Sequence, residues 1–264
     1  MSVACTVLLT SGVFAVSPST IGPRSDGFLP EVSVSPSVFS HTSFAVATTA
    51  SSSSAAFATN AGDSIFVFVS VWSKNTVSSV KDSVGDTFGQ LVFTSVQYAS
   101  MNSLAIWSAF NVVGGPSVKV TVTLAGTATD AAAVDVVDVT GVGPSPVDLL
   151  GTPSTSVMAG QTGKQFDNEI DANANDLVLA IVGSHNLARW SAAGVDALLD
   201  TQNALATGVR MAAADFQFSP TASGSVWMNG TANISFSEWV GDSIGLKPAN
   251  TVPEYSITFT ETGL

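Results

Sequence analysis

The sequence predicts an all-β protein, an antiparallel two-sheet β-sandwich of jelly-roll type with two pseudo-repeated halves. Three observations carry this prediction. Short runs rich in Val, Phe and Ile alternate with turns of Gly, Ser, Asn and Pro. No segment shows a sustained helical period bounded by caps, and two stretches of the chain follow one strand plan.

The clearest strand is DSIFVFVSVW (63–72), an almost continuous apolar run typical of a strand in a sandwich core. The low-complexity stretch before it (48–62) is expected on the surface. SVKVTVTLAG (117–126) alternates apolar and polar residues, as a half-buried strand does. The best helix candidate is AAGVDALLDTQNAL (192–205), with a loop containing one helical turn as the alternative. Further strand signals fall at 76–88, 103–112, 131–142, 175–185, 208–218, 223–236 and 237–248.

An internal similarity of the sequence predicts the two pseudo-repeated halves. TNAGDSIFVFVSVWS (59–73) resembles DANANDLVLAIVGSH (171–185), because in each Asn-Ala, one further residue and Asp precede a long apolar strand. Downstream, SLAIWSAFNV corresponds to RMAAADFQFS, and the segment from 117 to 139 corresponds to that from 223 to 246. The halves therefore share an order of strands.

Composition restricts the possible partners. Charged residues make up 11% of the 264 residues, against roughly 25% in ordinary soluble chains. The net charge is −12, and the 8 basic residues are scattered singly. Without a basic patch, binding to nucleic acid or to an anionic membrane surface is not expected. Beyond the N-terminus no apolar run reaches the ~18 residues that span a bilayer.

The N-terminal segment indicates export. Residues 1–15 have the length and small residues of a signal peptide, with cleavage expected after Ala15, and a first buried strand is the alternative. Cys5, the only cysteine, lies in this segment, so the mature chain would contain no disulfide. We expect an extracellular or cell-surface location, with membrane attachment only through this segment or a missing anchor.

The remaining chain is divided by Pro-rich stretches. Residues 16–34 are expected to be a linker, and 35–248 the β-sandwich domain. Residues 249–264 are expected to contain a linker and the first strand of a truncated following module. A strand donated to a neighbouring subunit is the alternative for this last segment.

Two resemblances add to this prediction. VSSVKDSVGDTF, IWSAFNVVGGPSVKVTVTL, NDLVLAIVG and the closing IGLKP resemble a β-sandwich module of large secreted microbial cell-surface proteins, over about residues 35–248. This resemblance implies no catalytic residues. YSITFTETGL (255–264) resembles the start of a β-rich repeat in archaeal secreted proteins, including relatives of thermopsin-type acid proteases. It implies an appended repeat and does not imply proteolysis.

No catalytic residue is predicted. GDSIG (241–245) matches the nucleophile-elbow pattern around Ser243, but that elbow needs a following helix, and here a strand and a linker are expected. GDSI also occurs around Ser64, which favours a turn-to-strand signal. Asp135 and Asp138 are three residues apart on one strand and should face opposite sides. The only histidines are His41 and His185, and neither is placed as a base.

Three sets of residues could bind or be modified. Asp82 and Asp86 could supply oxygens to a structural calcium ion, although turn formation explains them more simply. Trp190 beside Arg189 could stack on a sugar, whereas the other tryptophans are expected in the core. Asn229 and Asn233 begin glycosylation sequons. No other cofactor is expected.

These patterns favour a non-catalytic extracellular module with a structural or adhesive role, and with cell-surface components or glycans as partners. The alternatives are a carbohydrate-binding module attached to a secreted hydrolase, or a secreted hydrolase itself. Few ion pairs are expected, so protonation of the carboxylates between pH 5 and pH 3 should cost little stability.

Overall fold

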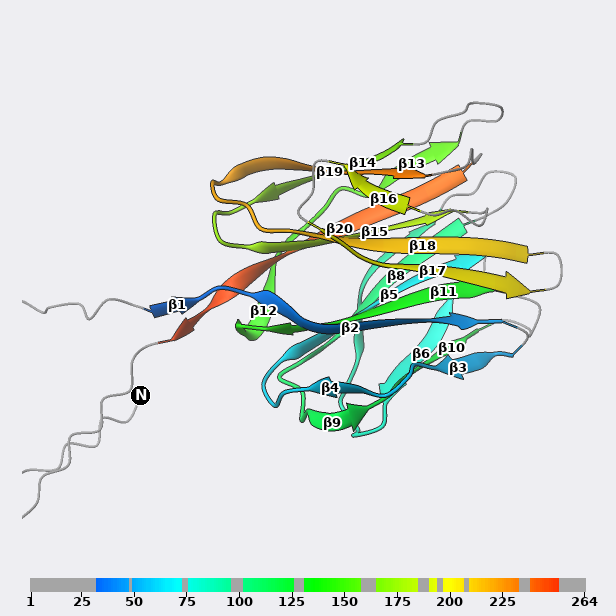
Figure 1. Ribbon diagram of the computed structural model, residues 1–264, viewed down its shortest axis with the longest axis horizontal. Helices are drawn as coiled ribbons and strands as arrows, with labels where there is room; N and C mark the ends of the chain where they lie inside the picture. The colour runs from blue at the N-terminus through cyan, green and yellow to red at the C-terminus, as the bar shows by residue number, and fades with distance from the viewer. Residues whose placement is uncertain are drawn as a thin grey trace, which may run out of the picture. The chain divides into compact units, whose positions relative to one another are not determined.

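Figure 1 shows the computed structural model of the chain, and the structure describes only part of its residues. Residues 34–249 form one compact unit, and the second unit (1–33 and 250–264) lies almost wholly outside the described residues. The predictions for the signal-like segment, Cys5, Arg189, His185, Asn233 and YSITFTETGL fall outside them as well. The described ranges are 32–47, 49–72, 76–95, 102–125, 131–157, 165–184, 190–193, 197–206, 209–232 and 238–251.

The described residues consist of strands, turns and loops, so the all-β prediction is confirmed. We call the strands from β2 to β11 the first half and those from β12 to β20 the second half. A short strand, β1 (Val32–Val34), precedes them, at the end of the stretch expected to be a linker. The first half contains β2 (Ser37–Val46), β3 (Ser51–Ser53), β4 (Phe57–Thr59), β5 (Ser64–Trp72), β6 (Val77–Asp82), β7 (Gly89–Ser95), β8 (Asn102–Phe110), β9 (Gly115–Val118), β10 (Val120–Leu124) and β11 (Ala132–Thr140). The second half contains β12 (Val142–Leu150), β13 (Ser154–Val157), β14 (Gln165–Ala172), β15 (Leu177–Ser184), β16 (Trp190–Ala193), β17 (Ala197–Ala206), β18 (Val209–Phe218), β19 (Gly224–Ala232) and β20 (Glu238–Thr251).

Each half contributes one main sheet. The first main sheet has the order β2-β11-β5-β8-β7. The second main sheet has the order β1-β20-β15-β18-β17, with β12 and β13 also paired to β20. Every pairing whose register is described is antiparallel.

Smaller sheets cover the outer side of each main sheet (Figure 1). In the first half these outer sheets are β3-β10-β6 and β4-β9, and in the second half the outer sheet is β14-β19-β16. Among the described residues there are thus five sheets, where the sequence predicted two. The two main sheets form the middle layers of the unit and the outer sheets cover them.

Two apolar cores explain the layers. The first-half core fills the space between the first main sheet and its outer sheets, and includes Val67, Val134, Val120 and Val122. The inter-half core joins the two main sheets. It contains Phe66, Phe68, Leu104, Ile106, Ala131, Ala133, Val137, Val139, Val142, Leu177, Leu179, Ile181, Val240, Ile244 and Leu246.

Because successive side chains of a strand point to opposite faces, β5 and β11 supply residues to both cores. Strands buried on both faces have almost continuous apolar sequences. That is the physical reason for the additional sheets: IFVFVSV needs a neighbouring layer on each side, whereas a two-sheet sandwich leaves one face of each sheet in solvent.

The expected helix at 192–205 is wrong. Strands β16 and β17 occupy the described part of this segment, and β17 pairs along its length with β18. The loop alternative is wrong for the same residues. Tertiary pairing along the edge of a sheet overrides the weak helical pattern of ALLDTQNAL.

The pseudo-repeat stays a prediction, and the two halves can be compared at their central strands. Ser64 and Leu177 begin the two central strands, opposite Val139 and Leu246. Before each strand, an amide of Asn60 or Asn173 donates to the Asp63 or Asp176 carboxylate, at 3.2 Å and 2.9 Å.

Candidate functional site

The serine of GDSIG lies inside a strand. Ser243 is fully buried in the middle of β20, which continues to Thr251, and it pairs with Ala180 of β15. Ser64, in the related GDSI, is fully buried at the start of β5. A nucleophile elbow requires an exposed serine on a sharp turn between a strand and a helix. Neither serine has that geometry.

Asp135 and Asp138 lie on β11 and point to different layers. Asp135 falls on the side of β11 that faces the inter-half core, with Ala133 and Val137, and Asp138 on the opposite side. Both are fully buried. They therefore do not form a pair of acid and base groups.

Asp82 and Asp86 come together in the turn after β6. Asp82 Oδ1 accepts hydrogen bonds from the amides of Val84, Gly85 and Asp86, at 3.1, 2.7 and 3.0 Å. Asp86 Oδ1 accepts one from the amide of Val113 at 2.9 Å. The Oδ2 atom of each is shielded from solvent and has no hydrogen-bond partner among the described atoms.

The Asp82 carboxyl group acts on that of Asp86. Burial raises the pKa of Asp86, the Val113 amide lowers it, and the hydrogen bond and charge of Asp82 raise it. Calcium takes 6–8 oxygen ligands, and within the described residues no three His, Cys, Asp or Glu side chains gather as a metal site. The calcium site at Asp82 and Asp86 stays a prediction, and turn formation accounts for the hydrogen bonds of Asp82.

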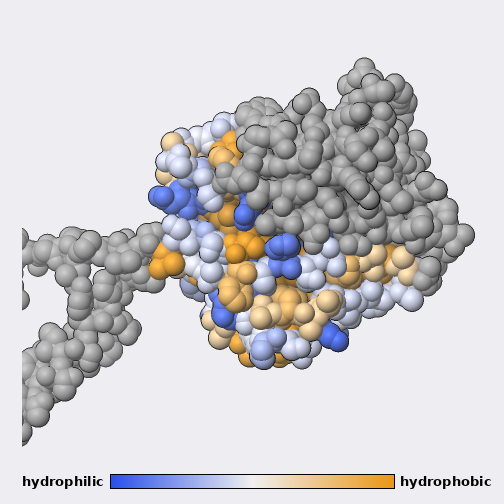
Figure 2. Space-filling model, in the orientation of Figure 1, coloured by the Kyte–Doolittle hydropathy of each residue, from blue (hydrophilic) through white to orange (hydrophobic). Residues whose placement is uncertain are grey.

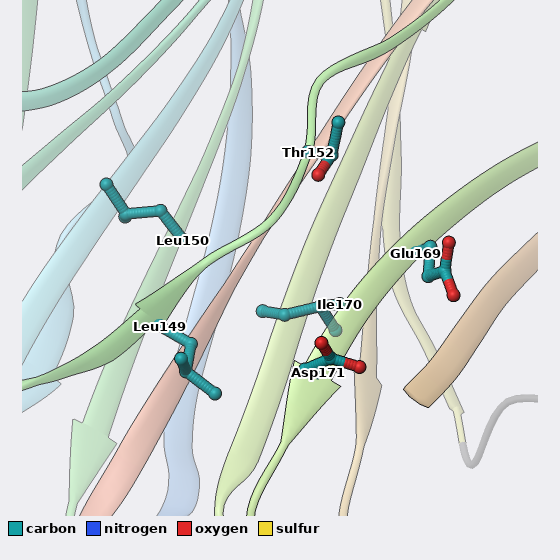
Figure 3. A pocket seen from close by; sticks show the side chains of 6 residues that line it. All are labelled: Leu149, Leu150, Thr152, Glu169, Ile170 and Asp171. Carbon is teal, nitrogen blue, oxygen red and sulfur yellow. The ribbon is translucent and has the colours of Figure 1, made fainter. Parts of the chain in front are cut away.

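A small open cavity lies at the edge of the second half, with a volume of about 270 Å³. Figure 3 shows Thr152 on the segment after β12, and Glu169, Ile170 and Asp171 on β14, with Leu149 and Leu150 on the other side of the cavity. The amide of Thr152 donates to the Glu169 carbonyl at 3.4 Å, which connects this segment to β14.

The chemistry of the cavity is mixed. Glu169 and Asp171 are exposed carboxylates two residues apart on β14, so they share the outer face of that strand. The hydroxyl of Ser225 donates to Glu169 Oε1. Leu149, Leu150 and Ile170 add apolar surface. Carboxylate acceptors beside apolar carbon can hold a small polyhydroxy ligand through its hydroxyl groups and its C–H face.

Two of the other predicted binding residues, Trp190 and Asn229, belong to strands of the outer sheet of the second half. Trp190 opens β16 opposite Ala232, and Asn229 lies in β19 between Asp167 and Ala193. Their side chains, and all of Arg189 and Asn233, lie outside the described part of the chain. The sugar-stacking and glycosylation predictions therefore stay predictions.

Sequence reasoning missed a set of interior carboxyl groups. Asp138 and Asp242 are fully buried, like Asp135. Burial, with a smaller contribution from the charge of Asp63, raises the pKa of Asp138 to about 8, although the nearby Val139 amide lowers it somewhat. Neither carboxyl oxygen of Asp138 has a hydrogen-bond partner of normal geometry among the described atoms.

Asp242 lies between the two main sheets. Its Oδ2 accepts a hydrogen bond from the hydroxyl of Thr94 on β7 at 3.1 Å, and its Oδ1 one from the amide of Ser243 at 2.8 Å. Burial raises the pKa of Asp242 to about 6, while the Ser243 amide and the Thr94 hydroxyl lower it. The sequence signal was the Asp inside each of two apolar runs, VVDVT and VGDSIG.

On the part of the face that Figure 2 colours, pale and hydrophobic residues are interspersed with a few separate strongly hydrophilic ones. The exposed large apolar residues are spread over different elements: Val34, Phe39, Val84, Phe93, Phe110, Val113 and Leu150.

Comparison with family models, with curated proteins and with solved structures found no match for this chain. No helix among the described residues is long and apolar enough to cross a membrane.

Proposed function

We propose that this chain is a non-catalytic, extracellular structural or adhesive module. The observation that carries the proposal is the layered packing of the unit at 34–249, in which two main sheets share one core and outer sheets cover them. A body in which long strands are buried on both faces is close-packed and stiff. These properties suit a module that presents a surface outside the cell.

The strand order supports the jelly-roll and pseudo-repeat parts of the proposal. In each half the chain passes between main and outer sheets in the same sequence, which is the connectivity expected when one jelly-roll plan occurs twice. The low content of charged residues, the predicted signal-like N-terminal segment and the two sequons support the extracellular location.

Localisation in the source cells tests the extracellular role. An antibody against the folded protein, combined with protease treatment of intact cells, should find the protein at the surface or in the medium. Recovery of all the protein inside intact cells, inaccessible to protease, would refute the proposal. A cytoplasmic marker protein controls for lysis.

A second candidate function, carbohydrate binding, rests on the cavity at Thr152, Glu169 and Asp171. Its volume of about 270 Å³ lies just below the ~300 Å³ at which ligand pockets usually begin, which suits a single sugar unit. The exposed carboxylates can accept hydroxyl hydrogen bonds, and Leu149 and Ile170 offer apolar contact.

A glycan array followed by calorimetry tests this candidate. If a glycan binds, Asp171→Asn should weaken binding about tenfold or more, because an ionised hydrogen-bond acceptor at a ligand is worth roughly 1.5–3 kcal/mol. Asp86→Asn, in the first half, is the matched control and should not change the affinity. Trp190→Ala tests the alternative platform. A blank array with correctly folded protein would remove this candidate function and leave the structural role untouched.

A further inference from the structure

The interior of the protein is unusually acidic. Asp135, Asp138 and Asp242 have no exposed surface, and each lies within a main-sheet strand. The described side chains of lysine, at Lys81, Lys119 and Lys247, are all exposed. An ionised carboxylate in an apolar core is costly unless it is paired with a cation or fully hydrogen-bonded.

Asp242 lies where the two halves meet. The Thr94 hydroxyl of the first half donates to its carboxyl group across the inter-half core. The strands around it, β5, β7, β8 and β15, contain no charged residue in their sequences. Ile181 of β15 pairs with Asp242 on one side and with Asp215 of β18 on the other. Asp215, which is also acidic, is therefore two strands away from Asp242.

Asp138 lies on the other side of the first main sheet, opposite Ile65 of β5 and Ser40 of β2. The charged group that acts on it is Asp63, which carries the same sign. The Ser40 hydroxyl donates to the Ala58 carbonyl at 2.9 Å. Asp138 therefore lies buried with one like charge acting on it and with the Val139 amide nearby.

Asp135 is a third interior aspartate, and it is compared by its position alone. It pairs with Phe68, the fifth residue of β5, as Asp242 pairs with Ile181, the fifth residue of β15. The elements that pack beside it include β2, with His41 next to Val137, and β17, which contains Asp200. An aspartate thus occupies the equivalent interior position in both halves.

We propose that the buried carboxyl groups of Asp138 and Asp242 make this fold acid-stabilised, so that the protein resists unfolding better at pH 4 than at pH 8. In the neutral form each group fills its place in the core without a buried charge. At alkaline pH each must either ionise inside the core or open the packing around it, and for Asp242 that packing joins the two halves.

The direction of the pH dependence follows from the difference in proton binding between the folded and the unfolded protein. The pKa of each group in the folded protein, about 8 for Asp138 and about 6 for Asp242, lies above the ordinary value of 3.8. The folded state therefore binds protons that the unfolded chain does not, and stability rises as the pH falls from 8 toward 4. Below about 3.8 both states are protonated, and the gain levels off.

Urea unfolding of the intact protein at pH 4 and pH 8 tests the proposal. We expect the wild-type midpoint to be higher at pH 4, by about 1 M urea or more for a chain of this size. The variant carrying Asp138→Asn and Asp242→Asn should lose most of this difference. Asp148→Asn, which changes an exposed carboxylate, is the control and should keep the difference, because both buried carboxyl groups remain in it.

A direct readout covers the case in which the double variant does not fold. Infrared spectra of the wild-type protein at pH 7 should contain the C=O band of a protonated carboxylic acid, which disappears on unfolding. A wild-type midpoint that is equal or lower at pH 4, or no protonated carboxyl band at pH 7, would overturn the proposal.

Discussion

Ser70 of β5 and Gly183 of β15 meet between the two main sheets. A Cβ atom added to Gly183 would lie 2.7 Å from Ser70 Cβ and would overlap the Ser70 hydroxyl. Both residues are the seventh of their strands, Ser64–Trp72 and Leu177–Ser184. The two main sheets approach so closely here that position 183 leaves no room for a side chain beside Ser70.

This contact predicts a strong effect of Gly183→Ala. The extra methyl group would meet backbone-anchored atoms of Ser70, and overpacking of a well-filled core costs about 1–3 kcal/mol. Urea unfolding should therefore show a large loss of stability. Gly143→Ala is the control, because a Cβ at Gly143 has no neighbour within 4 Å, and its stability should change by about 0.5 kcal/mol or less.

A compensating change separates the contact from other causes. Ser70→Gly removes the obstructing Cβ and a buried hydroxyl that has no hydrogen-bond partner among the described atoms. In the Ser70→Gly protein, Gly183→Ala should cost clearly less than in the wild type. Equal costs in both backgrounds would show that the two positions do not touch.

The two Asn–Asp turns predict parallel effects in the two halves. Asp63 Oδ2 accepts the Asn60 amide and side chain at 3.2 and 3.0 Å, and Asp176 Oδ2 accepts the Asn173 amide at 2.9 Å. Both aspartates are nearly buried, with 4% and 2% exposure. Asp63→Ala and Asp176→Ala should each cost about 1.5–3 kcal/mol, because each change removes a charged acceptor of the hydrogen bonds that close its turn.

Chemical denaturation measures both variants. Similar losses would agree with one turn design used twice. A cost confined to Asp63→Ala, with Asp176→Ala as stable as wild type, would contradict the equivalence of the turns.

The positions of the buried strands could be predicted well, because a buried strand has a recognisably apolar sequence. DSIFVFVSVW and NDLVLAIVGSH became β5 and β15, and the matching Asn–Asp turns precede both. The number of sheet layers was harder to predict from the sequence. Continuous apolar runs show that a strand is buried on both faces, but which sheets cover those faces depends on pairings far apart in the chain.

The weak helical pattern of 192–205 shows the limit of local reasoning. ALLDTQNALA is β17, held at a sheet edge by its pairing with β18 and packed near β2 of the other half. None of these neighbours is encoded locally. Tertiary context decides between helix and strand for a segment with so little periodicity.

The candidate site could be predicted only in parts. Asp82 and Asp86 do share one turn, since a spacing of four residues around Gly85 brings them together. The cavity could not be predicted, because its residues come from β14 and from the segment around Leu149, which are joined only in three dimensions. The burial of Asp138 and Asp242 could not be predicted either, because it depends on how the sheets pack on one another.

The Thr94–Asp242 hydrogen bond predicts a pH-dependent effect of Thr94→Val. The hydroxyl stabilises the ionised form of Asp242 more than the neutral form, so its removal should raise the pKa of Asp242 further. The variant should lose more stability at pH 8 than at pH 4, by about 1 kcal/mol. Denaturation curves at the two pH values measure this. An equal loss at both would mean that Thr94 acts only through packing.

The turn after β6 gives the last prediction. Asp82→Ala removes the acceptor of three amide hydrogen bonds and should destabilise the protein by about 1–2 kcal/mol, whereas Asp82→Asn keeps an acceptor oxygen and should cost less.

Asp86→Asn should raise the melting temperature at pH 8 and have less effect at pH 4. The reason is that the raised pKa of Asp86 makes its ionised form unfavourable beside Asp82.

Calcium distinguishes the two explanations of this turn. If turn formation alone explains the carboxylates, millimolar calcium should leave the melting temperature of the wild type unchanged, and Asp86→Asn should be stabilising with or without it. A calcium-dependent rise in the wild type that disappears in Asp86→Asn would instead establish the pair as part of a calcium site. The partnerless Oδ2 atoms of Asp82 and Asp86 would then be ligands, completed by main-chain carbonyls and water.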